Sequence, residues 1–366
     1  MKIAIVHDYL ITFGGAERVL VALHEMYPEA PIYVSIYRKK LLGKFAEKFK
    51  NAKIIQAPFG FIPFAERLIS PLRFLIPLIW KSIDLTEFDL VISSASWAVT
   101  KGFKKKKGAV EICYCHTPPR YLYGYDTSRR FKGLMGRLVK VYGFIVNHFM
   151  LQYDYKQAQK VDFFIANSLE VKKRIEKFYR RDSTVIYPPV EIVSPLPQKP
   201  NFKKHYLTGG RLTAAKNFDL IIEAFNKLKL PLKIYGKGAL GESLTKIAEG
   251  NIEFLGGIED SEMPKLHSGA KAFILAQKDE DFGITAIEAM GFGIPVIAFK
   301  GGGYLESVTE GKTGVFFDKL TSGSLEKAVK RFEKMRFKPE DCVSQARKFS
   351  RERFEKEIKE FINKHA

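Results

Sequence analysis

The sequence predicts an α/β protein with two domains, each built on strand–turn–helix units. Short apolar runs that end in glycine-rich turns and lead into helices recur along all 366 residues, which is typical of strand–turn–helix units. A chain of this length can bury two separate hydrophobic cores. The proline-rich stretch at 191–200 divides the two series and is the expected linker. We therefore expect domains at 1–190 and 191–345.

The composition is that of a soluble globular protein. Hydrophobic residues make up 46% and charged residues 27% of the chain, which argues against a disordered polymer. The cysteines Cys113, Cys115 and Cys342 are too few for a disulfide framework and have no Cys/His cluster beside them for zinc. We expect buried thiols in a reducing cytosol. The apolar run at 2–6 is too short for a signal peptide and suits a first strand.

The net charge of +20 is concentrated in the first half. Residues 1–190 contain 31 Lys or Arg and 16 Asp or Glu, whereas residues 191–366 contain 29 and 24. Such a basic face meets an anionic membrane surface, a phosphorylated lipid or a nucleic acid, unless it is only solvated. No helix-turn-helix, zinc-finger or RNP pattern supports the nucleic acid.

Two apolar segments of the first half are unusual. Residues 61–80 are nearly long enough to span a bilayer, but three prolines and three charges argue against a span. Residues 129–160 form a basic, aromatic run that predicts one or two amphipathic helices. Together with the lysines at 104–107, these segments either form a membrane- or lipid-facing surface or close a core.

Polar residues and glycines follow the first predicted strand. Gly14 and Gly15 stand before a helical pattern, where glycines let backbone amides approach an anion. A simple tight turn is the alternative. The full dinucleotide fingerprint is absent, so a nicotinamide site is not indicated. The strand expected at 110–114 runs into His116, and open parallel sheets bind ligands at this carboxyl edge.

The second half begins with a strand expected at 206–208 that ends in two glycines. Arg211 and Lys216 flank the start of the next helix, expected at 218–228. Two cations beside a helix N-terminus can hold a diphosphate, although they can also be ordinary surface residues. The rest of the half continues the same alternation, with strands expected at 232–235, 252–255 and 311–317, and a helical tail from 325.

The stretch 272–299 contains the most informative pattern in the chain. It predicts a buried strand, an acidic loop with Glu280, a helix that opens near 282–284, and a second buried strand. Gly283, Ile284 and Thr285 would place free N–H groups at the helix start, where anions bind. Glu288 would lie on the helix body. A phosphate site with two hydroxyl-binding acids suits a sugar nucleotide, although a plain βαβ unit with two surface glutamates also fits.

These motifs resemble the retaining GT-B glycosyltransferases of family four, which share an E-x7-E motif. The likeness extends over nearly the whole chain, and it rests on HDYLITFGGAERVL, GGRLTAAKN, YGKG, EDFGITAIEAMGFGIPVIA and GGGYLE. The stretch YCHTPPRYLY resembles the mannosyltransferase branch that acts in surface-polysaccharide assembly. The resemblance implies two Rossmann-like domains that face a central cleft, with residues 346–366 forming a helix that crosses back to the first domain.

The resemblance also implies roles in the second domain. Arg211 and Lys216 correspond to the diphosphate clamp, and the amides of residues 283–285 correspond to groups at the phosphates. Glu288 corresponds to the acid that binds ribose hydroxyls, and Glu280 to the acid that binds the transferred hexose. Ala276-Gln277 departs from the Pro-Ser that is frequent in the family before this loop.

In the first domain, Gly14 or Gly15 resembles the loop that closes over the β-phosphate, and His116 resembles the histidine that contacts the donor hexose. Asp8 and Glu17 are expected on the acceptor side, where either acid could orient the attacking hydroxyl.

The expected function is retaining transfer of a hexose, mannose from GDP-mannose, to a lipid-linked saccharide at the cytoplasmic face of a membrane. No cofactor and no metal are expected, because no DxD-type acidic pair follows a predicted strand and Arg, Lys and the helix dipole can meet the phosphate charge. No nucleophilic carboxylate can be named, so the resemblance implies front-face attack by the acceptor. A GT-B sugar-nucleotide epimerase and a basic nucleic-acid-binding protein are the alternatives.

Overall fold

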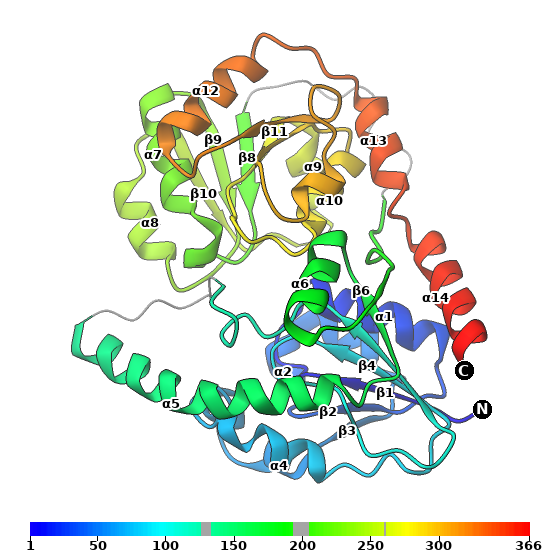
Figure 1. Ribbon diagram of the computed structural model, residues 1–366. Helices are drawn as coiled ribbons and strands as arrows, with labels where there is room; N and C mark the ends of the chain where they lie inside the picture. Colours follow the sequence, from blue (N-terminus) through cyan, green and yellow to red (C-terminus); the bar gives the residue numbers. More distant parts are fainter. Residues whose placement is uncertain (126–132, 193–204, 260) are drawn as a thin grey trace. The chain divides into compact units, whose positions relative to one another are not determined.

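The computed structural model describes residues 1–125, 133–192, 205–259 and 261–366, and these residues form two compact units. Unit 1 comprises residues 1–125, 133–189 and 351–366, and unit 2 comprises residues 190–350. Each unit contains one parallel β-sheet with helices on it (Figure 1). The predicted α/β class with two Rossmann-like domains is therefore confirmed. Most of the predicted linker at 191–200 lies outside the described residues.

Unit 1 is organised around a seven-stranded sheet with the order β3-β2-β1-β4-β5-β6-β7. Its order reverses between β1 and β4, and such a switch point is where parallel sheets bind ligands. The strands are β1 (Ile3–His7), β2 (Ile32–Val34), β3 (Ile54–Gln56), β4 (Leu90–Ala95), β5 (Val110–Cys115), β6 (Phe163–Ala166) and β7 (Thr184–Val185). The helices are α1 (Gly15–Met26), α2 (Lys39–Leu42), α3 (Ala65–Leu68), α4 (Ile76–Lys81), α5 (Gly133–Ala158), α6 (Leu169–Tyr179) and α14 (Arg351–His365), with 3₁₀ turns at Gly43–Phe49, Pro58–Phe61 and Arg73–Leu75.

The central strands of unit 1 are buried on both faces, which explains their continuous apolar sequences. Successive side chains point to opposite faces: Ile5 packs with α1 and α14, whereas Val6 packs in a second cluster with Trp80 and Met150. This second cluster joins α4 and α5 to the sheet.

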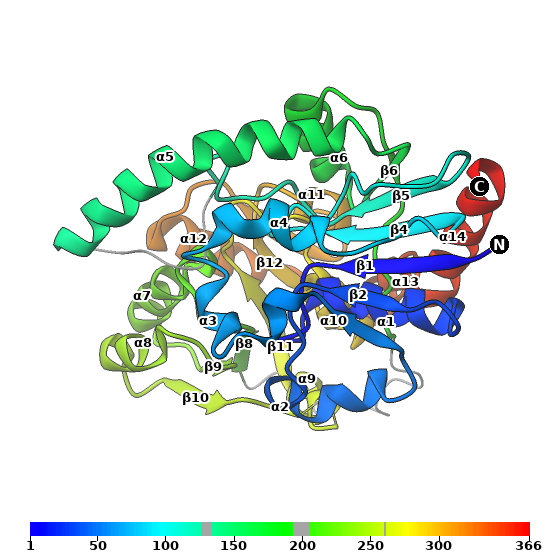
Figure 2. The same cartoon turned by 90° about the horizontal axis from the view of Figure 1, so that it is seen from below.

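The two unusual apolar segments are helical and lie side by side in unit 1 (Figures 1 and 2). Residues 61–80 form α3, a 3₁₀ turn and α4, and residues 133–158 form the single 26-residue helix α5. Arg73 joins them, because its Nε donates to Asn147 Oδ1 at 3.0 Å and its guanidinium lies 4.6 Å from the Tyr142 ring centroid.

The chain returns to unit 1 at its C-terminal helix. Sequence analysis placed the start of this segment at 346; in the structure α13 (Pro339–Arg347) still belongs to unit 2, and α14 begins at Arg351. Figures 1 and 2 show α14 beside α1. Arg351 pairs with Glu25 of α1, and the ring of Phe354 lies 5.9 Å from that of Tyr114 in β5.

Unit 2 is organised around a six-stranded sheet with the order β10-β9-β8-β11-β12-β13, which again reverses in its middle. Its core is a cluster that includes Ile222, Phe225, Ile234, Ile274 and Val329. The strands are β8 (His205–Gly209), β9 (Leu232–Tyr235), β10 (Ile252–Gly256), β11 (Ala270–Leu275), β12 (Val296–Phe299) and β13 (Gly314–Phe317). The helices are α7 (Phe218–Leu228), α8 (Gly241–Ile247), α9 (Met263–Ser268), α10 (Ile284–Gly291), α11 (Tyr304–Ser307), α12 (Ser322–Phe332) and α13, with a 3₁₀ turn at Ala214–Lys216.

Candidate active site

In unit 2 the candidate residues gather at the carboxyl edge of β8 and β11, the switch point of the sheet. A small pocket lies there, lined by Thr208, Gly209, Lys216, Phe218, Ile221, Ile274, Leu275, Ala276, Gln277 and Tyr304. Lys216 therefore reaches the pocket, as the diphosphate prediction requires. Arg211 is exposed in the same turn, two residues beyond the end of β8.

The turn after β8 is shaped by a close backbone approach. Gly236, in the turn after β9, has a φ of +118°, and a Cβ there would overlap the backbone carbonyl of Gly210. The two turns therefore touch through their main chains, and this contact supports the segment that carries Arg211 and Lys216. The Asn217 amide adds a second tie, because its Nδ2 donates to Ala276 O at 2.8 Å.

The glycine-rich loop that follows β12 holds Glu280 in place. Its backbone carbonyl accepts a hydrogen bond from Gly303 N–H at 2.9 Å, and the Tyr304 hydroxyl donates to its Oε2 at 3.2 Å. A Cβ on Gly302 would overlap this same stretch of backbone. The run 301–304 therefore positions the Glu280 loop, a role that the sequence did not indicate.

Helix α10 begins where the sequence predicted. Gly283 is its N-cap and has left-handed backbone angles, with φ +88° and ψ +49°. A Cβ there would lie 2.8 Å from the Tyr304 ring, so the position favours glycine on two counts. The first N–H groups of a helix have no partner within it, and in α10 these belong to Ile284 and Thr285. Glu280 precedes the helix and Glu288 lies on it, both half-buried.

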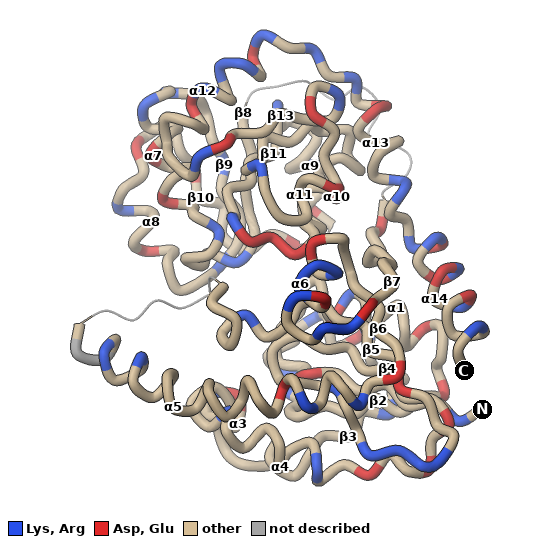
Figure 3. Tube along the Cα trace, in the orientation of Figure 1, with Lys and Arg blue, Asp and Glu red and all other residues tan. Residues whose placement is uncertain are grey.

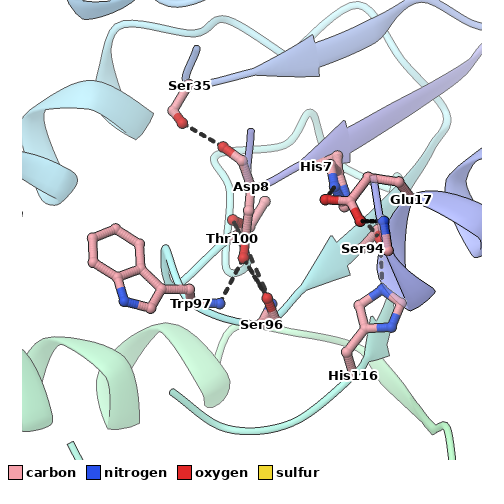
Figure 4. A network of polar contacts seen from close by, with 10 residues as sticks. His7, Asp8, Glu17, Ser35, Ser94, Ser96, Trp97, Thr100 and His116 are labelled. Carbon is pink, nitrogen blue, oxygen red and sulfur yellow. Dashed lines mark hydrogen bonds and ion pairs between the residues drawn. The ribbon is translucent and has the colours of Figure 1, made fainter. Parts of the chain in front are cut away.

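In unit 1 the candidate residues meet at the carboxyl ends of β1, β4 and β5 in a line of polar contacts (Figure 4). The Ser94 hydroxyl lies 3.0 Å from His7 Nδ1 and 2.8 Å from His116 Nε2. His7 Nε2 in turn faces Glu17 Oε1 at 3.8 Å. All four side chains are buried, each at most 7% exposed. The sheet register explains the centre of the line, because His7 and Ser94 are direct partners on neighbouring strands.

The shared hydroxyl couples the two imidazoles. A serine has one proton to donate, so it donates to one ring nitrogen and accepts from the other ring's N–H. If His7 is neutral with its proton on Nε2 toward Glu17, Ser94 donates to His7 and His116 carries its proton on Nε2. If His7 is doubly protonated, Ser94 must donate to His116, whose proton then lies on Nδ1. The hydrogen positions of the two rings are therefore coupled through Ser94.

The Asp8 side chain points inward. Its carboxylate is 2% exposed and accepts hydrogen bonds from Trp97 N–H at 2.6 Å, from the Ser96 hydroxyl at 2.7 Å and from the Thr100 hydroxyl. These donors all belong to the loop after β4. The side chain thus holds that loop in place, and a carboxylate with this many internal donors has little capacity left to orient an acceptor hydroxyl.

Glu17 also points inward, toward His7 and the start of α1. Its Oε2 accepts from Gly14 N–H at 2.8 Å across the first turn of α1. That N–H is therefore occupied and does not offer itself to a phosphate. Gly15 is the first residue of α1 and is exposed, so its N–H remains the better candidate of the predicted pair for anion contact.

Several functional candidates escaped the sequence analysis. His7 and Ser94 each lie near the end of an apolar run, but the pairing of β1 with β4 that joins them is a long-range feature. Tyr304 stood in a recognised glycine-rich loop, yet its contact with Glu280 spans 24 residues. For His7 and Ser94, the available signal was a polar residue at the end of each central strand.

The described residues also bear on metal binding, on membrane-spanning helices and on the cysteine thiols. Among the described residues, no three His, Cys, Asp or Glu side chains are grouped so that they could hold a metal ion, and no described helix has the length and hydropathy to cross a membrane. The three cysteines are buried thiols, and burial raises the pKa of Cys113 and Cys342 to about 12, so both stay protonated at neutral pH.

Comparison with known proteins matches both halves of the chain to glycosyltransferase families. The model of Glycosyltransferase Family 4 matches residues 13–193, and the model of Glycosyl transferases group 1 matches residues 194–349. The solved structure of Anabaena Alr3699/HepE in complex with UDP and glucose superposes with a TM-score of 0.71 at 20% identity, over 99% of each chain. At this identity the superposition shows a shared fold.

Two curated relatives are mannosyltransferases. The alpha-1,3/1,6-mannosyltransferase ALG2 of Kluyveromyces lactis is 24% identical over 84% of this chain and 71% of its own length. The GDP-mannose-dependent alpha-(1-6)-phosphatidylinositol monomannoside mannosyltransferase of Mycolicibacterium smegmatis is 31% identical over 32% of this chain and 36% of its own. This chain covers only 29–36% of the length of several curated relatives. With both family models matched in order and the fold shared along the whole chain, the protein belongs to the GT-B glycosyltransferases, with a family 4 first half and a group 1 second half.

Proposed function

We propose that the protein is a retaining glycosyltransferase that moves mannose from GDP-mannose to a saccharide acceptor. The observation that carries the proposal is the gathering of Lys216, Glu280 and the start of α10 around one sheet edge in unit 2, with Arg211 in the adjoining turn. The two mannosyltransferase relatives support mannose, and the name of one of them supports GDP-mannose.

The donor's diphosphate is the group that this edge suits best. Arg211 and Lys216 supply two positive charges, and the amides of Ile284 and Thr285 supply hydrogen-bond donors at the positive end of the α10 dipole. These groups also stabilise the charge that develops when the nucleoside diphosphate departs, because they are aimed before reaction at the place where that charge forms. No metal ion is required in this scheme.

The two glutamates divide the hydroxyl contacts. Glu288 on α10 accepts from the ribose, and Glu280 in the preceding loop accepts from the hexose. The Tyr304 hydroxyl, which donates to Glu280, fixes the orientation of that carboxylate. In unit 1, His116 contacts the hexose and Ser94 fixes its ring. Retention follows from attack of the acceptor hydroxyl on the face from which the diphosphate leaves.

The acceptor we propose is a lipid-linked saccharide of surface-polysaccharide or glycoconjugate assembly, met by a peripheral enzyme on the cytoplasmic face of a membrane. The basic first half of the chain supports this setting, because Lys and Arg attract anionic headgroups.

Calorimetric titration with GDP, UDP and ADP and with their mannose and glucose forms, with and without magnesium, tests the donor side. We expect tight binding of GDP-mannose that does not depend on magnesium. Arg211→Ala and Lys216→Ala should each weaken it roughly ten- to two-hundredfold, since a hydrogen bond to a charged group contributes about 1.5–3 kcal/mol. Lys246→Ala, an exposed lysine on α8 of the same unit, is the matched control and should bind normally.

Transfer to acceptor must be measured separately. Glu280→Ala should reduce transfer more than it reduces nucleotide binding, and unchanged turnover would remove Glu280 from the mechanism. Preference for UDP-glucose would replace the proposed donor. Donor conversion to an epimer without any acceptor would identify the alternative, a sugar-nucleotide epimerase.

A further inference from the structure

Exposed apolar side chains are concentrated on one part of unit 1. Of the sixteen large hydrophobic residues that are exposed in the described chain, ten lie within residues 61–78 and 138–149. They are Phe61, Ile62, Phe64, Phe74, Leu78, Leu138, Val141, Phe144, Ile145 and Phe149. Single exposed hydrophobics are normal on soluble proteins, but a concentration of this kind marks an interaction site.

Helix α5 presents half of this set as one stripe. Leu138, Val141, Ile145 and Phe149 recur at spacings of three and four, which places them along one face of a helix. Phe144 stands beside this stripe and is 83% exposed. The opposite face is committed to unit 1, because Asn147, Met150 and Asp154 pack or bond inward. The apolar stripe is therefore the outward side of a helix that is anchored from behind.

The second half of the set lies on the neighbouring segment. Phe74 adjoins Arg73, which bonds to α5, and Leu78 lies one turn further along α4. Figures 1 and 2 both show α4 next to α5. We name the exposed residues of 61–81 and 137–149 the apolar–basic face. It combines two segments that are about sixty residues apart in the sequence.

The charges of this face have one sign. Residues 57–83 and 133–153 together contain five Lys or Arg and a single acid, Glu66. That acid is paired with Arg38 at 3.0 Å. Arg67, Lys81, Arg137 and Lys140 are exposed around the apolar side chains, and Figure 3 shows basic residues along the traces of these helices. Large apolar side chains surrounded by cations are typical of an amphipathic helix that lies in the interface of an anionic bilayer.

We propose that the apolar–basic face binds an anionic membrane surface, with α5 lying in the headgroup layer. A second copy of this chain is a poorer occupant, because a symmetric dimer would set these cations against themselves with a single acid to offset them. The inference rests on the proposed function only for its setting, since a lipid-linked acceptor brings the enzyme to a bilayer. It adds the residues that contact the membrane and the negative charge of the lipid headgroups.

Co-sedimentation of the full chain with vesicles tests the proposal without any donor or turnover. We expect binding to phosphatidylcholine vesicles that contain phosphatidylglycerol, little binding to phosphatidylcholine alone, and weaker binding at high salt. Phe144→Ser/Phe149→Ser should lower the partition at least tenfold, and Arg137→Glu/Lys140→Glu should do the same for the anionic vesicles. Ile247→Ser, an exposed apolar residue on α8 in unit 2, is the matched control and should bind like the unaltered chain.

All the substituted side chains are exposed, so the variants should remain folded, and their nucleotide titrations show whether they do. The proposal is overturned if the unaltered chain ignores anionic vesicles, if the face variants bind as well as the control, or if the chain is a dimer that the Phe144 and Phe149 substitutions make monomeric. Vesicle binding without nucleotide binding would refute the proposed function alone. Nucleotide binding and transfer without vesicle binding would refute this inference alone.

Discussion

Lys101 and Asp154 form a buried ion pair in unit 1. Both side chains are at most 2% exposed and hydrogen-bonded to each other, and the Tyr123 hydroxyl donates to the second Asp154 oxygen at 2.6 Å. Burial by itself lowers the pKa of Lys101, but the Asp154 carboxylate outweighs it and raises this pKa, so the lysine keeps its charge. Asp154 lies on the inner face of α5, so the pair anchors the helix of the apolar–basic face.

Lys101→Met keeps the stem and removes the cation. The stranded carboxylate then either stays charged in the core or takes up a proton. Protonating a carboxyl of ordinary pKa, about 3.9, costs about 4 kcal/mol at pH 7 and about 1.5 kcal/mol at pH 5. The first value agrees with the roughly 3–5 kcal/mol measured when one partner of a buried pair is removed. We therefore expect a loss of about 4 kcal/mol at neutral pH that shrinks by roughly 2–3 kcal/mol at pH 5.

The sign of this pH dependence follows from the variant. In Lys101→Met the buried carboxylate has lost its cation, so the loss of stability should grow as pH rises above the ordinary carboxyl pKa, where the unfolded chain gives up the proton freely. Asp154→Asn strands the lysine instead and should show the opposite trend. The double variant carries neither charge, so it should lose less than Lys101→Met at pH 7 and should show little dependence on pH.

Urea unfolding followed by tryptophan fluorescence is the suitable assay, because both tryptophans, Trp80 and Trp97, belong to unit 1. The transition therefore reports on the unit that holds the pair. A loss in Lys101→Met that is equal at pH 5 and pH 7 would refute the reasoning, since it would trace the effect to packing instead of to an unpaired carboxylate.

Three smaller predictions follow from other contacts. Ser94→Ala removes the hydroxyl that two buried imidazoles share; unfolding free energy should fall by about 1–3 kcal/mol, and nitrogen NMR should show the loss of a fixed tautomer in both rings. Burial lowers the pKa of His267 to about 4. The free energy of unfolding of unit 2 should therefore fall by up to about 3 kcal/mol between pH 6.5 and pH 4. Chemical unfolding of His267→Phe should not show this trend. Gly283 has a φ of +88° and lies against the Tyr304 ring, so Gly283→Ala should lower the free energy of unfolding by about 1–3 kcal/mol and weaken donor binding. Gly250 has open space around it, so Gly250→Ala should do neither.

The local architecture could be predicted from the sequence because each element carries its own signal. The first strand was expected at 2–6 and lies at Ile3–His7. The helix after Lys216 was expected from residue 218 and begins at Phe218, and the helix of the acidic loop opens at Ile284 as expected. Apolar runs, glycines and caps act over a few residues, so periodicity and turn chemistry are enough to place such elements.

The directions of the acidic side chains could not be predicted in the same way. Asp8 and Glu17 stand beside a glycine-rich turn, which made them candidates for acceptor contact. Whether a carboxylate there faces outward depends on which backbone donors surround it, and the loop that captures Asp8 lies 88 residues further along. The partner of Glu280 is likewise a tyrosine 24 residues away. Such pairings follow from the strand order, which a local pattern does not contain.

The position of α14 determines when unit 1 can be completed during protein synthesis. This helix supplies Phe354, Ile358 and Ile362 to the core beneath β1 and β5, yet the ribosome makes it after all of unit 2. Domains usually fold in the order in which they emerge. Here unit 2 can finish first, while the sheet of unit 1 waits with part of one apolar face uncovered. A nascent chain that stalls between residues 190 and 350 would therefore expose that face, and a chaperone that binds apolar surfaces would recognise it.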